Sequence, residues 1–395
     1  MLRILLFFLL LASDCLFCSV TVTEENKDEV AVILTRSDSI PIESIEDCSD
    51  PYFEGYIQAL VDFNYAEYQV VVMVKDKEVW LANLPNNALI ADSIIAYICE
   101  VPGVKAVHKL NGVPPKDEEL REKYVDRPRL KGIWFPQMTE LFQPLVADPR
   151  EIVYSIGYRW GDQVIGDKVV PVSLGDDFSI YRWLDVWGGD LSIGIAACIW
   201  SVFDMDPPKP KINAGTELKN TDYLVGIPIQ YARNKWSFRF RVYHISSHLG
   251  DEFLVNNPGF VRVNPSREAV ELFASYQAYS FWRIYGGPGV NFHSDRTFKI
   301  KPLYFEYGTE LRFLGTKYIC QRLYGNFYAA AHFRSWAQLN WDFDGTFVAG
   351  YEFSKLQGIG RKIRFFFEYH NGFSLEGQFF NMRTSYWSFR LSYGF

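Results

Sequence analysis

The segment Trp387-Ser-Phe-Arg-Leu-Ser-Tyr-Gly-Phe395 decides the fold of this chain. Its apolar residues Trp387, Phe389, Leu391, Tyr393 and Phe395 fall on every second position, separated by small or charged residues. Because successive strand residues face opposite sides of a sheet, this pattern predicts a strand with one aromatic face and one polar face. A soluble sandwich that ends on an edge strand is the alternative, but an uncovered aromatic edge invites aggregation.

This segment resembles the C-terminal recognition strand of bacterial outer-membrane β-barrels. In that class, the last aromatic residue and the alternating apolar residues before it are the signal for insertion. The resemblance implies that the same five residues, Trp387 to Phe395, form an assembly signal that the barrel assembly machinery reads. It also implies that the protein is surrounded by outer-membrane lipid.

The N-terminal residues have the layout of an export signal. Arg3 precedes an apolar run over residues 4–12, and small residues follow, so we expect a signal peptide over residues 1–20. The run is about half as long as a helix that spans a bilayer. Cys15 and Cys18 leave lipidation open as an alternative.

Composition agrees with a barrel and excludes some partners. The aromatic content of 17% is about twice that of an ordinary globular chain. A net charge of −7 argues against nucleic acid as a partner, because nucleic acids select basic surfaces. Four cysteines follow the signal, Cys48, Cys99, Cys198 and Cys320; their spacing matches no zinc pattern, and we expect no metal or other cofactor. A disulfide between Cys48 and Cys99 is conceivable in an exported protein.

Residues 21–111 are predicted to form a small α+β domain. Helices are expected over residues 51–64 and 88–100, and strands over residues 69–74, 79–81 and 104–110. This αββαβ order, with Val101-Pro-Gly-Val104 before the last strand, resembles the BON domain, although Lys77 and Asn83 stand where that family usually has glycine. The resemblance implies a periplasmic domain that binds envelope partners. An unrelated α+β domain is the alternative.

Residues 112–150 are interpreted as a linker that carries proline and charge. Within it, Trp134-Phe-Pro-Gln137 and Leu141-Phe-Gln-Pro-Leu145 are predicted to dock against another part of the protein.

Residues 151–395 are predicted to form an all-β transmembrane barrel of about 12 antiparallel strands. The expected strands lie near residues 151–160, 169–183, 189–204, 219–233, 235–247, 268–283, 287–296, 302–314, 324–337, 340–354, 362–372 and 385–395.

The connections between these strands predict an orientation. Asp185-Val-Trp-Gly-Gly189, Arg233-Asn-Lys235 and Tyr285-Gly-Gly-Pro-Gly289 are short, whereas residues 204–217, 247–267 and 371–384 form long connections. Barrels have short periplasmic turns and long external loops. The N-terminal domain is therefore expected in the periplasm and the barrel in the bacterial outer membrane.

The chain also resembles DUF1207, a family known only as a domain of unknown function. The phrases that carry this resemblance are Glu140-Leu-Phe-Gln-Pro-Leu-Val-Ala-Asp-Pro-Arg150 and Ser246-Ser-His-Leu-Gly-Asp-Glu252. The resemblance implies no activity.

The polar faces of the strands predict a lumen that carries both signs of charge. Trp236, Phe238, Phe240 and Val242 are expected to meet lipid, and Ser237, Arg239, Arg241 and Tyr243 the lumen. Further lumen charges are Glu306, Glu310, Arg312, Arg364, Glu368 and Arg390. Crowded charges pair, because unpaired buried charges are costly. A tightly lined interior is therefore favoured over a wide porin, and the protein is expected to be non-enzymatic, either a narrow channel or a structural and interaction barrel.

One constellation could carry chemistry. His244 and Ser246 share the lipid-facing side of their strand, and a His-x-Ser pair there is similar to the catalytic pair of outer membrane phospholipase A and lipid A 3-O-deacylase. The resemblance implies that Ser246 is the nucleophile and His244 its general base, with Asn256 or Glu252 orienting the histidine. The protein would then be a lipid esterase. The alternative is that these are polar residues where the strand leaves the membrane.

Overall fold

The computed structural model describes residues 48–110, 115–123, 130–136, 139–207, 215–318, 323–356 and 359–395. The expected signal peptide, the lipidation alternative and Cys320 lie outside the described residues. None of the described helices is long and apolar enough to cross a membrane.

The first part of the described chain is a small α/β segment. Its elements are helix α4 (Asp50–Tyr65), the 3-10 helix η1 (Ala66–Tyr68), strands β1 (Val71–Lys75) and β2 (Glu78–Ala82), helix α5 (Ala88–Cys99), strand β3 (Ala106–Lys109) and helix α6 (Glu118–Lys123). β2 pairs with β1 in antiparallel and with β3 in parallel orientation. The core between sheet and helices contains Phe53, Ile57, Val74, Leu81 and Ile94. The αββαβ order predicted from the sequence is therefore observed.

Two positions without glycine still adopt the backbone conformation that glycine favours. Lys77 and Asn83 have φ angles of 64° and 59°. A non-glycine residue rarely adopts positive φ, and asparagine tolerates it better than lysine does. The turn geometry is thus kept although the glycines are missing.

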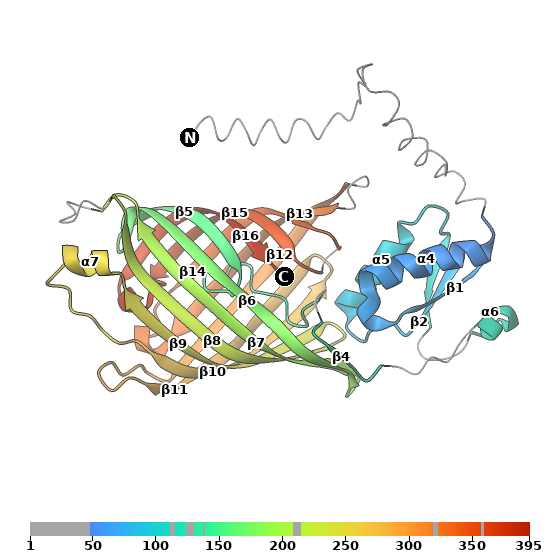
Figure 1. Ribbon diagram of the computed structural model, residues 1–395, viewed down its shortest axis with the longest axis horizontal. Helices are drawn as coiled ribbons and strands as arrows, with labels where there is room; N and C mark the ends of the chain where they lie inside the picture. The colour runs from blue at the N-terminus through green and yellow to red at the C-terminus, as the bar shows by residue number, and fades with distance from the viewer. Residues whose placement is uncertain are drawn as a thin grey trace, which may run out of the picture. The chain divides into compact units, whose positions relative to one another are not determined.

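The second part is a closed barrel of twelve antiparallel strands, β5 to β16 (Figure 1). The strands are β5 (Tyr154–Asp162), β6 (Gly166–Val186), β7 (Gly189–Asp204), β8 (Glu217–Arg233), β9 (Trp236–Leu249), β10 (Arg267–Tyr279), β11 (Trp282–Ser294), β12 (Leu303–Tyr318), β13 (Leu323–Trp336), β14 (Gly345–Ser354), β15 (Lys362–Phe373) and β16 (Arg383–Gly394). Each pairs with its neighbour in sequence, and β16 pairs with β5, which closes the barrel. The predicted fold class and strand number are confirmed.

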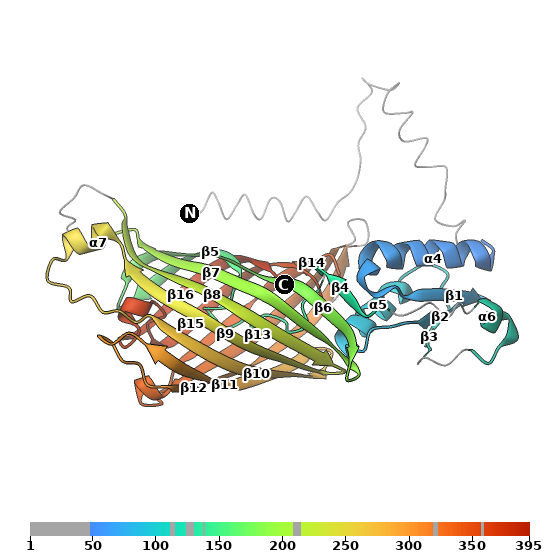
Figure 2. The same cartoon turned by 60° about the horizontal axis from the view of Figure 1, so that its bottom comes forward.

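Shorter elements decorate the barrel. Strand β4 (Gly132–Trp134) adds to the edge of the long strand β6, helix α7 (Asp251–Asn256) lies between β9 and β10, and the 3-10 helices η3 (Ala337–Leu339) and η4 (Gly377–Phe379) lie in two further connections. Figure 2 shows the strands strongly inclined as they wind around the barrel.

One predicted turn was wrong. Gly286, Gly287 and Gly289 lie inside β11, and the turn between β10 and β11 is formed by Ser280 and Phe281. These glycines serve close packing: a Cβ atom on Gly287 would lie 2.0 Å from the Leu272 carbonyl oxygen. Glycine in a strand commonly marks such an approach.

The connections otherwise follow the predicted pattern. Those from β6 to β7 and from β8 to β9 are short, whereas those from β7 to β8, from β9 to β10 and from β15 to β16 are long. The long connections lie at the end of the barrel opposite to the start of β5, because the strands alternate in direction.

The two faces of each strand separate as expected. On β9, Trp236, Phe240 and Val242 are exposed on the outside, whereas Arg239 and Arg241 are buried inside. On β16, Trp387, Phe389, Leu391 and Tyr393 are likewise exposed. Phe395 differs from these four: it follows the last residue of β16, is buried, and packs its ring beneath the Arg361 guanidinium at 4.3 Å.

The cysteine pair considered from the sequence does not form, since Cys99 is a free thiol. Cys198 is buried and also free.

Candidate functional site in the barrel lumen

The barrel interior is filled by residues 139–152, which we call the lumen segment. Its backbone is held by side chains from two separate strands of the wall. The Leu141 and Phe142 amides donate to Gln230 Oε1 on β8 at 3.1 and 2.9 Å, and the Val146 amide donates to Glu310 Oε1 on β12 at 3.0 Å. The second half of the sequence linker is therefore part of the barrel interior.

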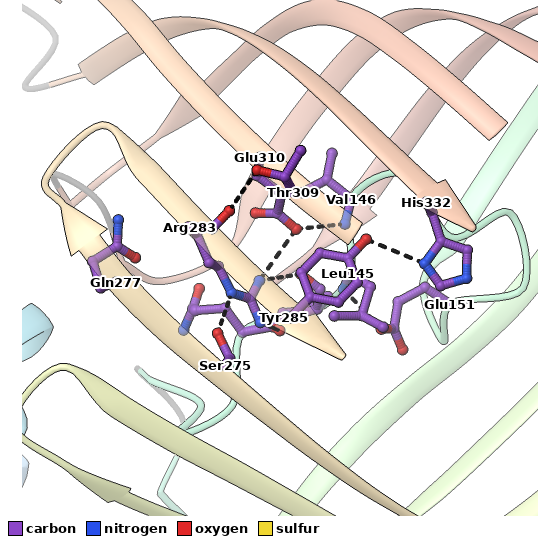
Figure 3. Close-up of polar contacts among 12 residues, drawn as sticks. Leu145, Val146, Glu151, Ser275, Gln277, Arg283, Tyr285, Thr309, Glu310 and His332 are labelled. Carbon is purple, nitrogen blue, oxygen red and sulfur yellow. Dashed lines mark hydrogen bonds and ion pairs between the residues drawn. The ribbon is translucent and has the colours of Figure 1, made fainter. Parts of the chain in front are cut away.

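Arg283 on β11 is the main polar anchor of the lumen segment (Figure 3). Its guanidinium donates to the Gln143 carbonyl at 2.6 Å and to the Pro144 carbonyl at 2.9 Å. It also pairs with Glu310 at 3.2 Å and donates to Ser275 Oγ at 2.7 Å. Carbonyl groups that enter a barrel without strand partners need such donors, because a buried unpaired polar group is costly.

A second anchor joins the end of the lumen segment to β9. Glu151 pairs with Arg239 at 3.3 Å and accepts a hydrogen bond from the Leu145 amide at 2.8 Å. Arg239 and Arg241 both pair with Glu271 on β10, at 3.2 and 2.9 Å. All these carboxylates and guanidiniums are buried.

Apolar contacts complete the fit. Phe142 and Leu145 pack with Phe273 and Tyr285 of the wall, and Ala147 packs with Tyr328, Ala330, Val348 and Phe366. The buried side chains of Phe142 and Leu145 remove from water apolar surface that an open pore would leave exposed. Both hydrogen bonding and packing therefore hold the lumen segment against the barrel wall.

The remaining lumen charges form a paired network. Glu352 bridges Arg312 and Arg364 at 2.8 and 3.1 Å, Arg390 pairs with Glu368 at 3.1 Å, and Arg159 pairs with Asp162 and Glu376 at 2.9 and 3.0 Å. The predicted inward direction and pairing of these charges are confirmed. An interior of this kind leaves no ring of one charge sign among the described residues.

A cavity of about 90 Å³ lies on the loop side of the lumen segment. Asp148 and Arg150 of the segment line it together with Arg241, Glu306 and Arg334 of the wall. The connection between β15 and β16 contributes Ser374, Leu375, Gly377 and Phe380 to the same cavity, and the Gly377 amide donates to Asp222 at 3.0 Å. The cavity is thus bounded by the lumen segment, the barrel wall and a loop.

His244 and Ser246 lie on the outer face of β9, as the sequence predicted. Among the described residues no hydrogen bond joins the two. The His244 Nδ1 atom lies 2.8 Å from Glu268 Oε1 on β10, directly across the strand pair. The other carboxylate oxygen of Glu268 contacts His293 on β11.

The two residues proposed from sequence to orient His244 both lie in helix α7. The Asn256 side chain donates to Glu217 on β8 at 2.7 Å, and Glu252 belongs to the first turn of the helix. In the structure, the Glu268 carboxylate instead lies within hydrogen-bonding distance of His244 Nδ1. Sequence reasoning missed this residue, and only the register between β9 and β10, which sets Glu268 opposite His244, could have found it.

Solved barrels resemble this one in fold. The outer membrane phospholipase (OMPLA) dimer of Salmonella typhi with bound calcium has 11% sequence identity and a TM-score of 0.41 over 62% of this chain and 93% of that chain. Outer membrane phospholipase A of Escherichia coli has 12% identity and a TM-score of 0.39, over 64% of this chain and 93% of that chain. The β domain of the Bordetella autotransporter BrkA has 13% identity and a TM-score of 0.33, over 61% of this chain and 95% of that chain. At these values the likeness carries no inference about activity.

No curated protein matches the sequence. The comparisons also give no support to the BON-like resemblance of the N-terminal region. A family model described as "Protein of unknown function (DUF1207)" matches residues 67–395, which include both phrases that carry the resemblance in the sequence. The chain therefore belongs to the DUF1207 family.

Proposed function

We propose that this protein is a closed, non-enzymatic barrel of the bacterial outer membrane, assembled by the barrel machinery and surrounded by lipid. The observation that carries the proposal is the lumen segment, which is bonded to β8, β11 and β12 and leaves a buried, ion-paired interior. A closed lumen favours a structural or interaction role over solute passage. The α/β segment would then face the periplasm and offer the surface for envelope partners.

The location has a direct test. Cell fractionation and heat-modifiable gel mobility should place the folded protein in the outer membrane. Exposed aromatic residues lie on the outer surface of at least one strand of each neighbouring pair in the barrel. Recovery in the soluble periplasm without detergent would contradict the proposal.

Planar-bilayer recording tests whether the lumen is closed. Wild-type protein is expected to give no unitary conductance, whereas a variant with residues 141–147 replaced by Gly-Ser repeats of the same length should conduct. The matched control carries Val255→Ser and Val261→Ser, which truncate exposed apolar side chains in the β9–β10 connection. This control should stay silent.

Two results would overturn the closed-barrel function. Reproducible unitary conductance of the wild type would favour the narrow-channel alternative. Silence of the Gly-Ser variant, with heat-modifiable mobility intact, would show that the lumen segment is not what closes the barrel.

A second candidate function is a lipid esterase on the outer face of the barrel. The observation that favours it is the Glu268 carboxylate on His244 Nδ1, because a base in a Ser-His pair needs an acceptor on its other ring nitrogen. The Nε2 atom of His244 would then take the proton from Ser246, two positions along the same face. Acyl substrates would reach the serine from the bilayer.

The esterase function predicts loss of fatty acid release in three variants. Ser246→Ala and His244→Ala should lower release from phospholipid or lipid A by at least about 100-fold, and Glu268→Gln should also lower it. Ser201→Ala is the matched control, because Ser201 lies on the outer face of β7 and bonds Thr221 at 3.0 Å. No fatty acid release from the wild type, with or without calcium, would eliminate this function.

A further inference from the structure

His332 is a buried histidine, and its ring nitrogen Nε2 has no hydrogen-bond partner among the described residues. The side chain lies on β13, points into the lumen and is 1% exposed. Its Nε2 atom is shielded from solvent and makes no hydrogen bond. Its Nδ1 atom lies 3.2 Å from the Tyr285 hydroxyl, as Figure 3 shows. A buried polar atom without a partner is rare and requires an explanation.

Two carboxylates face this nitrogen. Glu306 Oε2 lies 3.7 Å and Asp148 Oδ1 lies 4.0 Å from His332 Nε2. These separations are too long for hydrogen bonds. One ligand atom from each of the three residues lies within 4.8 Å of the others.

The separations fit a shared metal ion. Nitrogen and oxygen ligands of zinc lie about 2.0–2.2 Å from the ion, so two ligands on one ion lie roughly 3.0–3.6 Å apart. The separations of 3.7 and 4.0 Å from His332 Nε2 exceed this range by a few tenths of an ångström, and the two carboxylate oxygens, which lie within 4.8 Å of each other, have to move closer as well. Both residues also line the cavity of about 90 Å³, which leaves room for water as a further ligand.

The charge balance also favours a cation. A neutral imidazole with two carboxylates carries two negative charges, which a divalent ion neutralises. Arg334, which lines the same cavity, is already paired with Asp344. A mixed set of one imidazole and two carboxylates suits Zn²⁺, Mn²⁺ or Fe²⁺, whereas Ca²⁺ and Mg²⁺ prefer oxygen ligands alone.

The surrounding contacts hold each ligand in place. Tyr285 accepts the Nδ1 proton of His332 in the tautomer that leaves the Nε2 lone pair free for an ion. Trp336 Nε1 donates to Glu306 Oε1 at 3.1 Å, which leaves Oε2 for the ion. The Arg150 amide donates to Asp148 Oδ1 at 2.8 Å. Outer-shell bonds of this kind orient metal ligands in proteins.

We propose that Asp148, Glu306 and His332 form a binding site for a divalent transition-metal ion, with Zn²⁺ as the ion to be tested. The three ligands come from the lumen segment, β12 and β13. The ion would therefore clamp the lumen segment to the barrel wall, a property that goes beyond the closed-barrel function and does not depend on it.

The test uses full-length folded protein in detergent, stripped with a chelator and titrated with Zn²⁺ by calorimetry. The expected stoichiometry is one ion per chain. Asp148→Asn and His332→Gln should each weaken binding by at least about tenfold while leaving heat-modifiable mobility intact. Asp148→Asn keeps the shape of the side chain, so it separates ligand loss from misfolding.

Two matched controls remove competing histidines. His293→Gln disrupts the outer His244–Glu268–His293 group, and His370→Gln alters another buried histidine, which bonds Thr346 at 2.9 Å. Both controls should keep one Zn²⁺ per chain at unchanged affinity. Absence of stoichiometric binding, retention of binding in His332→Gln and Asp148→Asn, or loss of binding in His293→Gln would each overturn the proposal.

Discussion

Arg283→Ala should release the lumen segment without opening the barrel wall. In the wild type, this side chain makes contacts to two carbonyls of the segment, at Gln143 and Pro144, and to the carboxylate of Glu310. The variant leaves all three acceptors without this donor in a buried site. Glu310 keeps Arg312 at 3.0 Å, so its charge stays paired.

The size of the effect follows from these contacts. Leaving a buried hydrogen-bonding group without its partner costs about 1–3 kcal/mol. Two carbonyls of the lumen segment lose their donor, so we take about 3 kcal/mol in all. Both carbonyls that lose this donor belong to the lumen segment. The substitution therefore raises the free energy of the state in which the segment is inserted in the barrel. About 1.4 kcal/mol corresponds to a tenfold change, so the population with a displaced segment should rise by about 100-fold.

Cysteine labelling measures this population. Ala147→Cys places a thiol at a buried position of the lumen segment, in a background without the native cysteines. The rate of maleimide labelling in folded protein reports how often the segment leaves its site. Arg283→Ala should raise this rate by about 100-fold.

Arg233→Ala is the matched control, because Arg233 is exposed at the turn between β8 and β9. Its labelling rate should equal that of the parent. If Arg283→Ala changes the rate by less than about threefold while heat-modifiable mobility is intact, Arg283 does not anchor the lumen segment. An equal rise in the Arg233→Ala control would also refute the reasoning.

Three further predictions concern the wall. Gly287→Ala should lower the folded fraction on heat-modifiable gels, because its Cβ atom would meet the Leu272 carbonyl at 2.0 Å, whereas Gly259→Ala, with nothing within 4 Å, should fold normally. Phe367→Arg puts a charge on the lipid-facing side of β15 and should cost about 2–4 kcal/mol in urea unfolding from lipid vesicles if the site lies near the midplane; an unchanged midpoint would contradict that placement. Deleting Phe395 should reduce the assembled barrel but not the amount of chain synthesised, as pulse labelling and gel mobility would show; normal assembly would remove its role as a signal.

The sequence alone was sufficient for the architecture of the barrel. Strand residues alternate between two faces, so the order of aromatic and polar residues along β9 and β16 indicates which side chains face out of the barrel. This information is local, and it is repeated in each strand. It therefore predicted twelve strands, their inward charges and the ends at which long connections lie.

Glycine was the point at which the local pattern became ambiguous. The run Tyr285-Gly-Gly-Pro-Gly289 predicted a turn, yet these residues lie inside β11. Glycine and proline mark turns, but glycine also marks the places where another backbone or ring comes close. Only the position of β10, with the Leu272 carbonyl against Gly287, decides between the two.

The candidate sites depended on contacts between residues far apart in the chain. Leu141-Phe-Gln-Pro-Leu145 was predicted to dock, but that it fills the lumen depends on Arg283 and Glu310, more than 130 positions away. Glu268 reaches His244 only through the register of two strands, and Asp148 reaches Glu306 and His332 only through insertion of the lumen segment. Period-two alternation determines which face a side chain occupies. Strand register and barrel closure determine its neighbours, and these arise only when the whole chain has folded.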